Sequence, residues 1–195
     1  MATEEASATY CVVLGLETQI GLNVVRELGR AGIKVIGIAQ TDSAIGLRSR
    51  HLWKGLVEPR ARSAELLAML KAVGHQFGPC PLLAISEANL LWMSQHRVDL
   101  QPLQAVLAPP EAFRIVLDKS ATLDAARAVG LQVPASWQPL SAQDIDSRAD
   151  EFPLPAVLKW SDPNRVIAAL EQASLPLLKA EYVESGSELR AALSR

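Results

Sequence analysis

A turn bounded by glycines near the N-terminus is one feature of the sequence that could do chemistry. Gly15 ends an apolar run of five residues, and Gly21 lies where a helical pattern begins. A strand that passes through such a turn into a helix presents backbone N–H groups to an anion. However, Glu17 stands where a dinucleotide-binding turn needs its second glycine, and its carboxylate would repel a pyrophosphate. The pattern therefore favours a tight turn that packs helix on strand over an NAD site.

A lysine in a short strand-like segment is a second such feature. Lys159 shares one face of the segment 155–160 with Val157 and lies between apolar neighbours. We expect its ammonium group to be partly withdrawn from water and therefore to need an anionic partner. Two partners stay open. One is Glu181 in a neighbouring strand, and the other is a phosphate or carboxylate ligand held by Lys159, by Lys179 or by both. A freely hydrated ammonium group at Lys159 would overturn any functional interpretation that rests on a nucleotide anion bound there.

Other residue types give weaker signals. Lys119 follows Asp118 at the start of a predicted helix, where a lysine opposes the helix dipole. The three histidines and two cysteines share no metal-ligand spacing, and no nucleophilic triad is visible. We therefore expect neither a metal site nor a catalytic residue in this chain.

The elements that must position the glycine turn form an alternating pattern of strands and helices. Five apolar runs predict strands: 10–14, 34–39, 52–57, 81–85 and 104–107. Strands that are apolar on both faces and alternate with helices predict an α/β fold with a Rossmann-like, open and mostly parallel sheet covered by helices on both faces. Ligands of such sheets bind at the carboxyl ends of the strands. We therefore expect substrate-binding residues among Gly15, Glu17, Gly21, Ser86 and Glu87.

The pattern changes after Pro109 and Pro110. Helical stretches are followed by a polar, acidic segment and by two short strands that lie far apart in the sequence, which is typical of an α+β region. Two strands give a marginal core, so this region resembles the opening portion of a larger domain. We divide the chain into a disordered tail at 1–9, a Rossmann-like domain at 10–112 and a small, incomplete α+β region at 113–195.

Composition excludes several classes of protein. The chain has 195 residues, of which 49% are apolar, and a formal net charge of −2. It lacks the basic excess of a nucleic-acid or anionic-membrane binder, and no apolar run reaches the ~18 residues that span a bilayer. With two cysteines and no signal-peptide pattern, the sequence predicts a cytoplasmic protein that binds small molecules rather than nucleic acid or membrane.

Six segments in order resemble the front domain and the beginning of the ATP-grasp domain of ATP-grasp ligases. The likeness is to carboxylate–amine ligases and carbamoyl-phosphate-synthase-like members, and it covers the chain after Tyr10. The segments are the glycine turn with its first βαβ unit, 46–51, 84–87, 118–119, 128–134 and 155–159.

The resemblance implies that ATP activates a carboxylate as an acyl phosphate, which an amine then attacks, with Mg²⁺ bridging the phosphates. It also implies that Lys119 and Lys159 contact the ATP phosphates, a role that suits lysine as a mobile point charge. The family's glycine-rich flap is replaced here by residues 160–165, which contain no glycine. The adenine hinge and the acidic Mg²⁺ ligands of the family would follow beyond Arg195. The chain is then either a piece of a longer ligase or a protein that has lost the chemistry. We expect ATP and Mg²⁺ in a complete protein, and neither tight binding nor turnover by this chain alone.

Two other functions stay open. One is an enzyme that binds NAD(P) or a nucleotide sugar on its Rossmann-like sheet. Glu17 argues against this function, because it stands where the dinucleotide-binding turn needs a glycine. The other is a non-catalytic module that forms a homodimer through the front domain. A binding assay with NAD(P) tests the first alternative, and light scattering tests the second.

Overall fold

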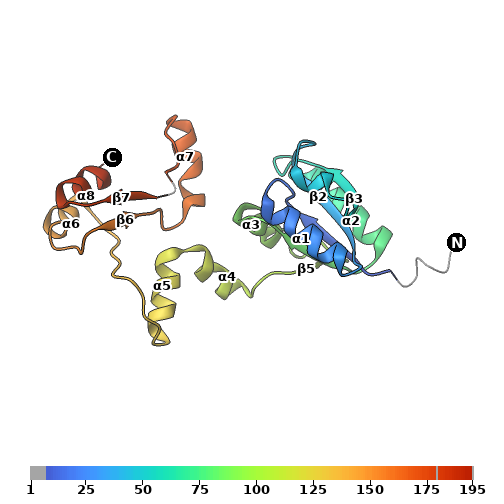
Figure 1. Cartoon of the computed structure of the whole chain (residues 1–195), viewed down its shortest axis with the longest axis horizontal. Coiled ribbons are helices and arrows are strands. Elements are labelled where there is room, and N and C mark those ends of the chain that lie inside the picture. The colour runs from blue at the N-terminus through green and yellow to red at the C-terminus, as the bar shows by residue number, and fades with distance from the viewer. Residues whose placement is uncertain (1–7, 179, 195) are drawn as a thin grey trace. The chain divides into compact units, whose positions relative to one another are not determined.

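The computed structural model describes residues 8–178 and 180–194, which form two compact units (Figure 1). Unit 1 ends at Ala108 and unit 2 begins at Pro109. The boundary expected between residues 112 and 113 falls inside α4 (Pro110–Leu117), a helix that packs against its neighbour in unit 2. Pro110 occupies the first turn of α4, where its missing N–H group costs no helical hydrogen bond.

Unit 1 is built from five strands and three α-helices that alternate along the chain. Its elements are β1 (Tyr10–Leu14), α1 (Gln19–Arg30), β2 (Lys34–Ala39), the 3₁₀ helix η2 (Ile45–Arg48), β3 (Leu52–Val57), α2 (Ser63–Phe77), β4 (Pro81–Ala84), α3 (Glu87–Gln95) and β5 (Gln104–Ala105). The strands form one sheet in the order β3-β2-β1-β4-β5, and every pairing is parallel. The α/β, Rossmann-like fold predicted for this part of the chain is thereby confirmed.

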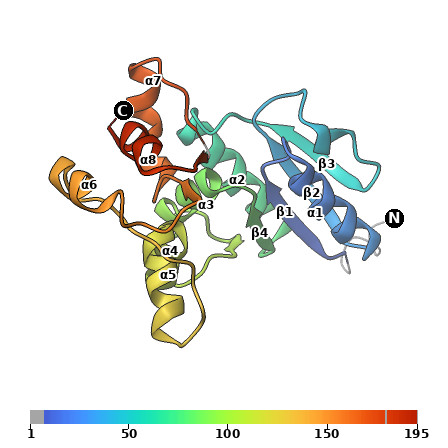
Figure 2. The same cartoon turned by 60° about the vertical axis from the view of Figure 1, so that its left-hand side comes forward.

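Both faces of the sheet are buried under helices, as Figure 2 shows for α1 over β1 and β2. Cys11 and Val13 belong to the apolar cluster that includes Val25 of α1. Val12 and Leu14 belong to a second cluster, which includes the inner residues of α2 and α3. Because successive side chains of a strand point to opposite faces, a strand covered on both sides must be apolar throughout. This requirement explains the unbroken apolar runs of the sequence.

Both cysteines lie in this core, each only 4% exposed. Burial raises the pKa of the Cys11 thiol to about 11, and the nearby Cys80 adds to the rise. Burial also raises the pKa of the Cys80 thiol. Since the thiolate is the reactive form, we expect neither cysteine to react with a disulfide reagent at pH 8 in the folded chain. Two thiols per chain should react in denaturant, and reaction of either under native conditions would contradict this packing.

Unit 2 has a much smaller core. Its elements are α4, α5 (Lys119–Ala128), α6 (Ala142–Arg148), β6 (Ala156–Leu158), the 3₁₀ helix η3 (Pro163–Arg165), α7 (Ile167–Gln172), β7 (Glu181–Val183) and α8 (Gly186–Leu193). β6 and β7 form an antiparallel pair. A cluster of three buried residues, Ala149, Val183 and Leu189, holds this pair against α6 and α8.

No helix among the described residues is both long and apolar enough to cross a membrane.

Candidate functional site

The residues predicted to bind substrate in unit 1 lie where β1 and β4 end. We call this region the front crevice and define it by Gly15, Glu17, Gly21, Ser86 and Glu87. The hydrogen bonding between β1 and β4 ends at this point, where the Ile85 amide donates to the Leu14 carbonyl at 2.8 Å. In the strand order 3-2-1-4-5, the chain turns in opposite directions after β1 and β4. Such a switch point is the usual ligand crevice of an open parallel sheet.

The glycine turn packs tightly, as the sequence indicates. Thr18 caps α1 by accepting a hydrogen bond from the Gly21 amide, and Gly21 is buried. A Cβ atom at Gly21 would overlap the carbonyl oxygen of Gly15. Gly21 therefore lets the first turn of α1 lie directly against the end of β1.

The Glu17 side chain links the turn after β1 to the end of β2. Its carboxylate accepts a hydrogen bond of 2.5 Å from the Gln40 amide, at the end of β2. The side chain thus places a negative charge over the β1–β2 edge of the front crevice. This charge is unfavourable for a pyrophosphate at the turn.

Ser86 begins α3 in an unusual conformation. Its φ is +90°, in the region that non-glycine residues rarely adopt, and its hydroxyl accepts from the Asn89 amide at 3.3 Å. Backbone strain of this kind, which costs on the order of 1–3 kcal/mol, concentrates at functional sites. Glu87 occupies the first turn of α3.

Two residues next to the front crevice could not be identified from the sequence. Asn89 is only 1% exposed, and its side-chain oxygen accepts from Arg60 at 2.9 Å. The spacing Ser86-x-x-Asn89 predicts a helix start but not a buried amide. Arg60 follows β3 in a loop, 29 residues earlier in the sequence, so no local pattern could connect it to Asn89.

In unit 2, the predicted phosphate-binding lysines lie on two segments that hydrogen bonds hold together. The Ser161 hydroxyl donates to the Asp118 carboxylate at 2.9 Å. The Lys119 amide donates to the Ser161 carbonyl at 3.1 Å, and its ammonium group donates to the same oxygen at 3.4 Å. Because Lys159 precedes Ser161 by two residues, their Cα atoms lie within about 7 Å. The structure thus brings the Lys119 and Lys159 segments together, although 40 positions separate them in the sequence.

The environment of Lys159 differs from the expected one. Lys159 lies just after β6 and is exposed, so its ammonium group is not withdrawn from water. The antiparallel register sets Glu181 opposite Leu158 rather than opposite Lys159. The expectation of partial burial was wrong because the strand ends at Leu158, before the lysine. Desolvation therefore gives no argument for a ligand at Lys159. Lys179, the weaker candidate, lies outside the described residues.

The Asp118 carboxylate connects Ser161 to the start of α5. Hydrogen bonds from the Ala121 amide and the Ser161 hydroxyl lower the pKa of the Asp118 carboxyl, and the positive charge of Arg165 contributes to the shift. A lowered pKa stabilises the folded state above the usual aspartate pKa, and this stabilisation is lost as the pH falls through the lowered value.

We expect Asp118→Ala to loosen the start of α5. Loss of an N-cap costs about 1 kcal/mol, which corresponds to roughly fivefold faster amide hydrogen exchange at residues 119–123 at pH 6. The difference from the unmodified chain should shrink as the pH falls below the usual aspartate pKa, since the pKa of the Asp118 carboxyl is lowered. Asp124→Ala, which removes only the exposed ion pair of Asp124 with Arg127, is the control and should change exchange less than twofold. Equal effects of the two variants would contradict the role of Asp118.

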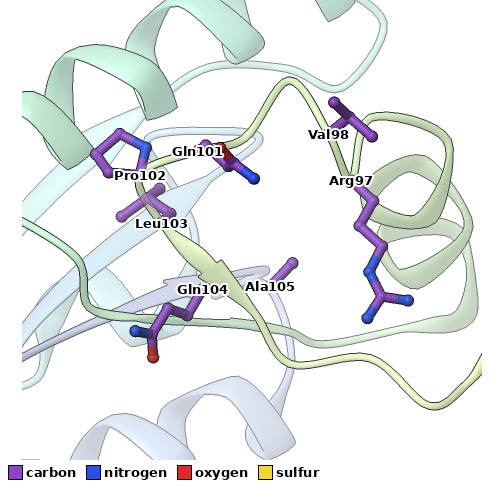
Figure 3. A pocket seen from close by; sticks show the side chains of 7 residues that line it. All are labelled: Arg97, Val98, Gln101, Pro102, Leu103, Gln104 and Ala105. Carbon is purple, nitrogen blue, oxygen red and sulfur yellow. The ribbon is translucent and has the colours of Figure 1, made fainter.

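A pocket of about 470 Å³ lies elsewhere in unit 1 (Figure 3). Arg97, Val98, Gln101, Pro102, Leu103, Gln104 and Ala105 line it. All seven belong to one continuous stretch, whereas ligand sites usually collect polar groups from several elements. None of the predicted site residues lines this pocket. Among the described residues, no three His, Cys, Asp or Glu side chains could together hold a metal ion.

Comparison with solved structures identifies the fold. N5-carboxyaminoimidazole ribonucleotide synthetase from Thermus thermophilus matches with a TM-score of 0.66 and 16% identity, over 94% of this chain and 43% of that one. L-amino acid ligase from Bacillus licheniformis matches with a TM-score of 0.64 and 13% identity, over 95% and 41%. The biotin carboxylase domain of Hydrogenobacter thermophilus 2-oxoglutarate carboxylase, solved with MgADP, ADP and bicarbonate, matches with a TM-score of 0.61 and 14% identity, over 94% and 39%.

This chain has the fold of the amino-terminal part of ATP-grasp enzymes. It spans about two-fifths of the length of the ATP-grasp structures it matches. The resemblance found in the sequence is confirmed at the level of the fold. No family model matches the sequence, and no curated protein does.

Proposed function

We propose that the chain forms the amino-terminal part of an ATP-dependent ligase that joins a carboxylate to an amine. The observation that carries this proposal is the hydrogen-bonded cluster of Asp118, Lys119 and Ser161. This cluster holds the Lys119 and Lys159 segments together in a chain with the fold of the amino-terminal part of ATP-grasp enzymes. Both lysines are exposed. Their ammonium groups are therefore accessible to a phosphate.

The proposed roles follow from the chemistry of phosphoryl transfer. Lys119 and Lys159 would bind ATP phosphate oxygens and stabilise the charge that moves between them. The substrate carboxylate would take the γ-phosphoryl group and release ADP. The amine would then form the C–N bond and release phosphate. The front crevice of unit 1 would hold a substrate.

ATP and Mg²⁺ belong to the complete protein in this proposal. MgADP bound to the Hydrogenobacter carboxylase domain supports this assignment. The two lysines and Arg165 supply positive charge suited to phosphates, but we assign Mg²⁺ no ligand within residues 8–178 and 180–194. We therefore expect no tight ATP binding and no turnover by this chain alone.

Product analysis tests the proposal. The protein translated from the whole reading frame that contains these 195 codons is incubated with MgATP and a panel of carboxylates and amines. We expect ADP and phosphate in equal amounts with the C–N product. AMP with pyrophosphate would indicate a different activation chemistry. Binding of NAD(P) by this chain, or a reading frame without further ATP-grasp sequence, would overturn the proposal.

A further inference from the structure

We propose that Arg60 is the anion-recognition residue of the front crevice, and that the ligand held there carries a carboxylate or phosphate group. This inference rests on the proposed function, because it names the chemical group by which unit 1 would hold a substrate. The contacts that support it lie entirely within unit 1.

The Asn89 side chain is held in one orientation. Its Nδ2 group donates to the Ile85 carbonyl at 2.9 Å. A carbonyl can only accept, so the amide nitrogen must face Ile85 and the amide oxygen must face Arg60. That oxygen accepts from the Arg60 guanidinium at 2.9 Å. Because Asn89 is almost completely buried, it fixes one end of the guanidinium at the end of β4.

Gly15 leaves room for this arrangement. Its φ is +107°, and a Cβ atom there would lie 2.7 Å from Nδ2 of Asn89 and 2.8 Å from the Ile85 carbonyl oxygen. A larger residue would displace the amide that holds Arg60. Gly15 therefore has a second role besides the turn into α1.

The contact with Asn89 leaves the charge of Arg60 uncompensated, since an amide is neutral. Arginine has five N–H donors in a planar fork, and the contact with Asn89 uses one nitrogen of it. Carboxylate and phosphate are the groups that match this fork. Arg60 is only partly buried, so its remaining donors are accessible to a ligand.

The neighbouring charges favour an anion at Arg60 and not elsewhere in the front crevice. Arg62, two residues later, pairs with Glu58 at 3.2 Å and with Glu65 at 3.4 Å, so carboxylates already neutralise it. On the other side, Glu17 holds a negative charge over the β1–β2 edge. Glu87, in the first turn of α3, places a second carboxylate beside Ser86. Within the front crevice, an anionic group would therefore bind at the Arg60 guanidinium, which an amide and not a carboxylate holds.

NMR titration of the 195-residue chain tests this inference at constant ionic strength. Inorganic phosphate and succinate are the two probes. The probe whose titration saturates identifies the chemical group of the ligand. We expect saturable shifts of the Asn89 side-chain amide and of the Gly15 amide. Arg60→Gln should weaken binding at least tenfold. Arg60→Lys should weaken it less, because it keeps the charge but loses the planar fork.

The control is Arg30→Gln, which removes the same charge from an exposed ion pair with Glu27 at the end of α1. It should bind the probes like the unmodified chain. Amide spectra of each variant report whether unit 1 remains folded. No saturable shift with either probe, or equal affinity in folded Arg60→Gln, would overturn the inference. Since this assay uses no ATP, its failure leaves the ligase proposal to be decided separately by product analysis.

Discussion

Lys159→Met is expected to lower kcat/KM for the proposed ATP-dependent ligase reaction by at least about a hundredfold, the usual cost of removing one group that stabilises transition-state charge. Methionine keeps a flexible apolar side chain of similar length and removes only the positive charge. Because Lys159 is exposed, this substitution should leave the fold of unit 2 intact. Steady-state kinetics of the protein from the whole reading frame provide the measurement.

Two further variants show whether the effect belongs to the lysine pair. Lys119→Met should also lower kcat/KM, and the double variant should lose less than the product of the two effects, since both groups would act on the same phosphates. Lys71→Met, on α2 of unit 1, is the matched control and should retain full activity. Full activity of Lys159→Met would remove the lysine from the proposed site.

Gly21→Ala is expected to destabilise unit 1 by about 3 kcal/mol, at the upper end of the usual cost of overpacking. The added methyl group would overlap the Gly15 carbonyl. Backbone atoms cannot rotate away as a flexible side chain can, so α1 or the end of β1 must move. Urea unfolding, followed by circular dichroism, measures the change in the free energy of unfolding.

Asn23→Ala provides a control on the same helix. Asn23 is exposed, so its replacement should change stability by less than about 0.5 kcal/mol. Because the glycine turn borders the front crevice, Gly21→Ala should also weaken any anion binding at Arg60. A stable Gly21→Ala variant would show that α1 does not pack on β1 as described.

Hydrophobic patterning alone predicted the fold of unit 1. Strands buried on both faces need continuous apolar runs, and parallel strands need crossover helices, so the pattern at residues 10–39 has few folded solutions. The same reasoning placed Gly15 and Ser86 at one edge of the sheet, because parallel strands share the direction in which they end.

Residues that act through distant contacts could not be predicted in this way. The sequence determined that Asp118 and Lys119 begin a helix, but only the tertiary structure placed Ser161 against them. It also decided that β6 ends at Leu158, which leaves Lys159 exposed, and that Arg60 meets Asn89 across 29 residues. Hydrogen bonds between loops depend on where the sheet and helices bring the chain in space. The periodicity of helices and strands, by contrast, depends on residues that are close together in the sequence.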